Sequence, residues 1–441
     1  MGPPTQSYVV QPQVLEVPEL PFLQIVQVQP TILDFDNNDY EVRAALIRAV
    51  INYLVAPPPA IPILPGPGSP PPLPRLASPP TPWLVNFPEM YCPVDLLLDE
   101  IAPALQPGQL ISTGICPLRP PPAPAVSFFD LEALLALQER LSGENAPVSL
   151  KTPEVLSGLI QYVGAHGGVA NLAATLTVEG DARASLILHS KLAPSQFECS
   201  LALDENTVPG RFLHPITLKA PDNRSMTILL LICSDLIEPI EATGRSILKN
   251  WPDQRGLDID LINVLNVQRI DSTSPHLPLW PIKVRDVLRD LLNGNFGPAF
   301  QATHVLLTNV GSFQFEAKVH TGGQSSFVVR GNQTLDSEVQ FKLLSDWNGN
   351  ATLFGFGAWA TGSSSLDFTW YDHEAVLKKH FVPHGPPILA QLRPAPPPGG
   401  VKAVVQVLKL RLNNKFGLAA VQGGQLLAIG DSIATYSRES S

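Results

Sequence analysis

The sequence predicts a layered α/β protein, because short apolar runs alternate along the chain with segments of helical period. Hydrophobic residues make up 44% of the 441 residues and charged residues only 15%, so the chain can bury a large core. Its 47 prolines are concentrated in a few blocks that interrupt these elements. We therefore expect a globular α/β domain with proline-rich surface loops.

The apolar runs define the predicted strands. The run 226–232 (MTILLLI) is continuously apolar, so we expect both faces of that strand to be covered. Runs 168–178 and 184–189 are separated by the turn residues 179–181, which predicts a β-hairpin. In chain order, strands are predicted at 22–28, 83–87, 110–115, 168–178, 184–189, 226–232, 257–267, 304–310 and 325–329.

Three segments predict helices. Residues 36–38 supply turn and N-cap groups for a helix over 40–54, whose apolar residues recur at every fourth position. Further helices are predicted at 128–141 and 284–292. The proline blocks at 57–59, 65–82, 117–124 and 394–398 cannot be helix interiors or central strands.

The pattern changes after about residue 371. A short helical piece (372–380), the last proline block and a β-hairpin (401–412 and 418–430) are expected there. We divide the chain into an N-terminal extension (1–19), a main domain (20–370) and a C-terminal appendage (371–441). The proline blocks are most simply loops between core elements, and docking of a protein partner of the SH3 or WW type is the alternative.

Charge and composition exclude several classes of function. The net charge of −10 and the pI near 5.4 give no general attraction to nucleic acid or to anionic lipid. No apolar stretch approaches the roughly 20 residues that span a bilayer, and the first ten residues carry neither a secretion signal nor a lipid-anchor motif. Four scattered cysteines suit a reduced, cytoplasmic protein, and there is no CxxC pair to suggest a metal or cofactor site.

Three reactive side chains follow the ends of predicted strands. Glu89 comes after the strand 83–87, Lys191 after the strand ending at 189, and Cys233 after the strand 226–232. Open α/β sheets bind ligands at the carboxyl ends of their strands, so we expect these side chains to converge on one crevice. Taken singly, each has a plainer interpretation: a buried thiol, a solvated loop lysine and a helix-start carboxylate.

Taken together and in this order, the surroundings of these residues resemble the nitrilase (carbon-nitrogen hydrolase) superfamily. LVNFPEMY with Glu89, HSKLAPSQFE with Lys191 and Glu198, and LLLICSDLIEP with Cys233 are similar to its three catalytic motifs. The segments FLQIVQVQP, ISTGI, TVPGRF, TNVGSF and GGQSSFVVRGN resemble supporting elements, so the resemblance covers about residues 20–370. The chain departs from the pattern in its long interval between Glu89 and Lys191 and in Ser234, where many relatives have an aromatic residue.

The resemblance implies a four-layer α-β-β-α sandwich and a thiol-dependent hydrolase of non-peptide carbon-nitrogen bonds. The substrate would be a small linear amide, carbamoyl or nitrile compound. Cys233 would be the nucleophile and Glu89 the general base, with Lys191 and the Ser234 N–H stabilising the developing charge. Glu198 would hydrogen-bond Lys191 or the substrate, although a surface carboxylate is equally consistent with its sequence. A homodimer or larger homo-oligomer is also implied.

Three other interpretations are open from the sequence. The thioester could be captured by an amine or alcohol, which would make the protein an acyltransferase. The fold could instead be a catalytically quiet module for protein assembly. A Cys-His protease would need His166, His189 or His214, and no local signature of such a family is present. Asp235 is favourable at a helix start in any case, so we leave it outside the triad.

Overall fold

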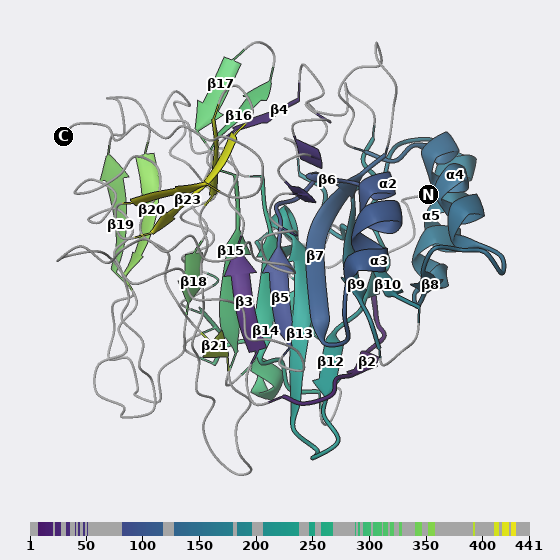
Figure 1. The fold of residues 1–441 in the computed structure, drawn as a ribbon, viewed down its shortest axis with the longest axis horizontal. Coiled ribbons are helices and arrows are strands. Elements are labelled where there is room, and N and C mark those ends of the chain that lie inside the picture. Colours follow the sequence, from purple (N-terminus) through teal and green to yellow (C-terminus); the bar gives the residue numbers. More distant parts are fainter. Residues whose placement is uncertain are drawn as a thin grey trace.

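Figure 1 shows the computed structural model of the chain, a mixed α/β protein built on two large sheets. It describes residues 8–51 with gaps, 82–117, 128–179, 183–195, 206–237, 247–267 apart from 252–256, and 287–310 with gaps. Beyond residue 310 it describes isolated strands as far as residue 428.

The first sheet has eight strands in the order β21-β3-β5-β7-β9-β10-β8, with β6 also beside β7. β3, β5 and β7 are parallel, and β9 and β10 form the predicted antiparallel hairpin. The strands are β3 (Leu23–Gln27), β5 (Trp83–Asn86), β6 (Cys92–Pro93), β7 (Gln109–Cys116), β8 (Ser149–Leu150), β9 (Leu172–Thr177), β10 (Ser185–Ser190) and β21 (Gln391–Leu392).

The second sheet has six strands in the order β18-β15-β14-β13-β12-β2. β13, β14 and β15 are parallel, so their carboxyl ends lie at one edge. Every residue of β13 after the first is buried, which confirms that both faces of this strand are covered. The strands are β2 (Gln13–Glu16), β12 (Ile216–Lys219), β13 (Ser225–Ile232), β14 (Leu261–Leu265), β15 (His304–Thr308) and β18 (Ser326–Val328).

The segment before residue 20 contains two strands that the sequence did not predict. β1 (Val9–Val10) pairs in parallel with β11 (Phe212–Leu213), and β2 pairs in parallel with β12. Part of the expected N-terminal extension therefore forms an edge of the second sheet.

The two sheets pack face to face through a shared apolar core. Leu84, Leu110 and Ile187 of the first sheet belong to the same buried cluster as Leu261 and Leu306 of the second. Because side chains alternate along a strand, neighbouring residues face outward into other clusters. Apolar side chains of both sheets therefore meet in this buried cluster.

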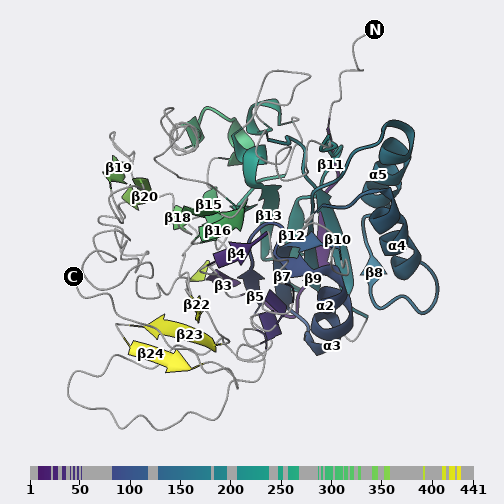
Figure 2. The ribbon, with the colours of Figure 1, turned by 90° about the horizontal axis from the view of Figure 1, so that it is seen from above.

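Helices cover the outer face of the first sheet. α4 (Leu131–Leu141) and α5 (Pro153–His166) bury residues in the same cluster as Leu186 and Leu188 of β10, and Figure 2 shows them stacked outside that sheet. α4 was predicted, and the Asp130 carboxylate caps it by accepting a hydrogen bond from the Ala133 N–H. α5 was not predicted, because its two glycines and its valines weaken the helical pattern.

The outer face of the second sheet packs against short segments. Leu229 and Leu231 of β13 share a buried cluster with Leu236, Leu248 and Phe300, which come from 3-10 turns at Cys233–Leu236, Leu248–Asn250 and Pro298–Phe300. Residues 287, 290 and 291 of the predicted helix 284–292 are helical, as are 40, 43–44, 47–48 and 51 of the predicted helix 40–54.

Smaller elements complete the described structure. A helical segment runs through α2 (Val94–Leu96), a π-helical turn (Leu97–Ile101) and α3 (Ala102–Ala104). The C-terminal hairpin prediction corresponds to a three-stranded antiparallel sheet, and the segment 372–380 and nearly all of the proline blocks lie outside the described residues. The remaining strands are β4 (Ile32–Asp34), β16 (Ser312–Phe315), β17 (Lys318–Thr321), β19 (Gln340–Ser345), β20 (Thr352–Gly357), β22 (Leu410–Asn413), β23 (Gly417–Gln422) and β24 (Gln425–Ala428).

A search of the described residues finds no helix with both the length and the hydropathy needed to cross a membrane.

Candidate active site

Glu89 lies in a tight turn that follows β5 and crosses directly over β7. The Gly114 N–H donates to the Pro88 carbonyl, and the Tyr91 N–H donates to the Gly114 carbonyl. Met90 has a positive φ of 52°, a left-handed conformation that favours glycine. A Cβ on Gly114 would lie 2.2 Å from the Met90 nitrogen and 2.4 Å from the Glu89 Cα. Only glycine at this position lets the turn lie so close to the strand.

Lys191 follows β10, and its main chain is held on both sides. Its N–H donates to the Asn171 carbonyl at 3.0 Å, and its carbonyl accepts from the Gly210 N–H at 2.6 Å. Its Nζ reaches Glu89 Oε1 at 2.8 Å, and both side chains are only 1% exposed. Glu89 and Lys191 therefore form a buried ion pair between residues 102 positions apart.

The Glu89 carboxylate accepts hydrogen bonds on both of its oxygens. Oε1 accepts from Lys191 Nζ and from Asn171 Nδ2, each at 2.8 Å, and Oε2 accepts from the Val267 N–H at 3.1 Å. Asn171 was not predicted from the sequence. Its local signal is a lone carboxamide within the largely apolar run 168–178.

Cys233 is the first residue after β13 and has a positive φ of 47°. Non-glycine residues held in this region are strained, and they cluster at functional sites. The thiol packs in a buried cluster with Ala173, Ile232 and Leu265, and Sγ lies 4.0 Å from the Val267 carbonyl oxygen. Val267 thus contacts Cys233 through its carbonyl and Glu89 through its N–H.

Asp235 joins the Cys233 turn to the segment that follows Lys191. Its Oδ1 accepts from the N–H groups of Leu192 (2.9 Å) and Ala193 (2.7 Å), and its Oδ2 accepts from Ile232 (3.1 Å). Burial raises the pKa of Asp235 to about 7, against the opposing effects of the Lys191 charge and these N–H donors. Asp235 is outside the predicted triad, and its contacts make it a group that positions both segments.

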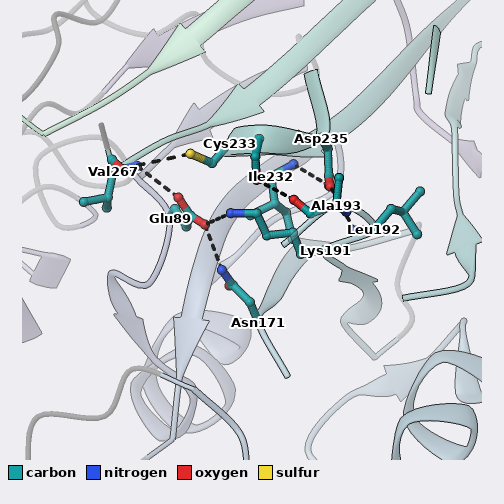
Figure 3. A network of polar contacts seen from close by, with 10 residues as sticks. Glu89, Asn171, Lys191, Leu192, Ala193, Ile232, Cys233, Asp235 and Val267 are labelled. Carbon is teal, nitrogen blue, oxygen red and sulfur yellow. Dashed lines mark hydrogen bonds and ion pairs between the residues drawn. The ribbon is translucent and has the colours of Figure 1, made fainter. Parts of the chain in front are cut away.

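The Ser234 side chain makes a parallel connection. Its Oγ donates to the Ala193 carbonyl at 2.5 Å, and the residue is buried. Figure 3 shows the resulting cluster, in which Glu89 and Lys191 come from the first sheet while Cys233 and Val267 come from the second. Glu198 lies outside the described residues.

The three histidines considered above bond other groups. His166 at the end of α5 contacts the Tyr162 carbonyl, His189 contacts Thr175, and His214 contacts the Gln11 carbonyl. Desolvation lowers the pKa of His189 and of His214, so the neutral imidazole is favoured at both positions.

The described residues hold no metal-binding cluster, and a hollow formed by them lies away from the site. Among the residues that the structure describes, no three His, Cys, Asp or Glu side chains are arranged to hold a metal ion. A hollow of about 320 Å³ lies between the end of α4, β8 and the start of α5, lined in part by Leu141, Leu150 and Arg183. Its lining includes none of the site residues.

Comparison with known proteins gives one similarity to a solved structure. No protein family profile matches the chain, and no curated protein matches it. The chain is similar to a crystal structure of an N-terminal amidase, with a TM-score of 0.29 and 10% sequence identity. The match covers 62% of this chain and spans 55% of the length of the amidase chain.

Proposed function

We propose that this chain is a thiol-dependent hydrolase of non-peptide carbon-nitrogen bonds, built on a nitrilase-like α-β-β-α sandwich. Its substrates would be small linear amide, carbamoyl or nitrile compounds. The observation that carries the proposal is the buried Glu89–Lys191 ion pair at 2.8 Å, next to a cysteine in a left-handed conformation at a strand end. Burying such a pair costs several kcal/mol of desolvation free energy per ion. A purely structural ion pair would therefore contribute little net stability.

In the first half of the reaction, Glu89 accepts the proton of the Cys233 thiol while the sulfur adds to the substrate carbonyl carbon. The negative charge that develops on the substrate oxygen is stabilised by the Lys191 ammonium and the Ser234 N–H. Protonated Glu89 then gives its proton to the leaving nitrogen as the carbon-nitrogen bond breaks. The products are a free amine and a Cys233 thioester.

In the second half, Glu89 accepts a proton from water while the water oxygen adds to the thioester carbon. The carbon-sulfur bond breaks, the proton returns from Glu89 to the sulfur, and the carboxylic acid leaves. For a nitrile, the same sulfur would add to the nitrile carbon. One carboxylate serves both halves because Lys191, Asn171 and the Val267 N–H hold it in a single orientation.

The test is intact-mass spectrometry of the protein after incubation with a panel of small amides and nitriles. We expect an acyl adduct on the wild type and on Cys92→Ala, which removes a different buried thiol, but none on Cys233→Ala. An adduct that persists in Cys233→Ala, or an absence of adduct and product with every compound, would contradict the proposal.

The same experiment separates hydrolysis from acyl transfer. When an amine or alcohol is added, an acyltransferase converts the thioester into a conjugate, whereas a hydrolase releases the free acid. A scaffold without activity would instead keep its biological effect when Cys233 is replaced by alanine.

A further inference from the structure

A buried guanidinium lies behind the turn that carries Glu89. Arg43 is 4% exposed, and its Nη1 donates to the main-chain carbonyl of Met90 at 3.1 Å and lies 3.6 Å from Cys116 Sγ. Its Cζ also lies 5.7 Å from the centroid of the Tyr40 ring. This cation is far along the chain from the site residues and was not predicted from the sequence.

Apolar packing anchors the segment that carries Arg43. Ile47 and Ile51 are buried in the cluster that covers the outer face of the first sheet. On the exposed side, Arg48 forms a two-point ion pair with Glu100, and a pair so exposed to solvent contributes little to holding the segment. The buried isoleucines therefore hold the segment, and with it the Arg43 guanidinium, next to the Met90 carbonyl.

The Glu89 turn needs such a contact. On its inner side it is bonded to Gly114 of β7, and Met90 is in the left-handed conformation that non-glycine residues rarely adopt. The direction of the Glu89 side chain follows from the main-chain orientation of this turn. A charge-assisted hydrogen bond to the Met90 carbonyl is stronger than a neutral one, so it fixes the Met90–Tyr91 peptide plane, one residue after Glu89.

We propose that Arg43 is a positioning residue for Glu89: by holding the Met90 carbonyl, it fixes the orientation in which the carboxylate meets Lys191 and receives the Cys233 proton. This inference rests on the proposed function.

The experiment measures how fast iodoacetamide alkylates Cys233 across a pH series, read on the Cys233 peptide by mass spectrometry. Alkylation requires the thiolate, so it reports proton transfer from the thiol without a substrate. We expect Arg43→Ala to slow alkylation near neutral pH by on the order of tenfold to a hundredfold, the size of effect that a small misplacement produces. Its pH profile should shift to higher pH.

Matched variants test whether the change in alkylation rate is specific to the Arg43 guanidinium. Arg48→Ala removes an exposed arginine about one turn further along the same segment and should leave the profile unchanged. Arg43→Lys keeps a cation and should recover part of the alkylation rate. Guanidinium ions below denaturing concentration should restore the alkylation rate of Arg43→Ala, whereas sodium chloride at the same concentration should not. If Arg43 served stability alone, its loss would speed alkylation by exposing the thiol, and this inference would be overturned.

Glu89→Gln separates this inference from the proposed function. If Glu89→Gln slows alkylation while Arg43→Ala and Arg43→Lys behave like the wild type, Arg43 does not position the base and the proposed function stands. If Glu89→Gln is alkylated like the wild type, Glu89 is not the base, and the proposed function and the role of Arg43 fail together.

Discussion

Glu89 and Lys191 stabilise each other in the interior, and this interdependence can be measured. Lys191→Met leaves the Glu89 carboxylate buried without its cation, which should lower the free energy of unfolding by about 3–5 kcal/mol. Urea unfolding followed by circular dichroism measures this loss.

The double variant Glu89→Gln/Lys191→Met is the control for this prediction. It removes both charges, so its loss of stability should be smaller than the sum of the two single losses. Strict additivity would mean that the two side chains do not interact in solution.

Gly114 gives a second prediction at the residue scale. The Cβ of Gly114→Ala would overlap the Glu89–Met90 main chain, so this variant should lose about 1–3 kcal/mol of stability, with activity falling on the order of a hundredfold. Gly158→Ala is the control, because its Cβ would meet nothing nearer than 3.7 Å within α5. It should stabilise the protein by roughly 0.5–1 kcal/mol. Equal effects of the two substitutions on activity would contradict the close packing of the turn.

The turn after β13 makes the protein sensitive to pH through Asp235. Burial raises the pKa of this carboxyl from 3.8 to about 7, so the folded protein binds the proton more tightly than the unfolded chain does. The resulting contribution to stability is present below pH 3.8 and is lost as pH rises through about 7. Each unit of difference in pKa corresponds to about 1.4 kcal/mol.

The comparison with Asp235→Asn isolates this contribution. The unfolding free energy of the wild type minus that of the variant should fall between pH 3.8 and about 7 and then stay level. Asp260, whose pKa burial raises to about 6, is present in both proteins and cancels. Asp222→Asn removes an exposed carboxylate, so its unfolding free energy should decline with pH over this range as that of the wild type does. A difference that does not change with pH would show that the pKa of Asp235 is the same in the folded and unfolded states.

At the scale of elements, the sequence predicted best the strands that are buried along their whole length. β13 and β7 were found to within one residue at either end, and every residue of both strands except Ser225 is buried. β2 and β12 were missed. They are short strands at one side of the second sheet, and β2 is held by β12, about 200 positions away in the chain.

The site was predicted in part for the same reason. Glu89, Lys191 and Cys233 each follow a strong strand signal, so their places at strand ends could be inferred. Asn171, Asp235 and Arg43 act through contacts with segments remote in sequence, such as the Arg43 bond to the Met90 carbonyl. No local pattern encodes such contacts, and only the packed structure identifies them.

At the scale of the whole molecule, the site is divided between the two sheets. Leu306→Ala, in the core that the sheets share, should cost about 2–5 kcal/mol, because the cavity it leaves weakens the contact between them. Urea titration should show that the difference in Cys233 alkylation rate between the wild type and Glu89→Gln disappears at the urea concentration at which tertiary structure is lost. If that difference disappeared well before this transition, the two sheets would separate without global unfolding.

The link between Glu89 and Cys233 is made by the peptide groups of Val267, not by its side chain. Every amino acid except proline carries the same N–H, so exchanging the side chain at this position leaves both polar contacts chemically intact. The two halves of the site therefore communicate through a part of the protein that ordinary point mutation cannot delete. A scan of alanine substitutions would pass over this connection unnoticed.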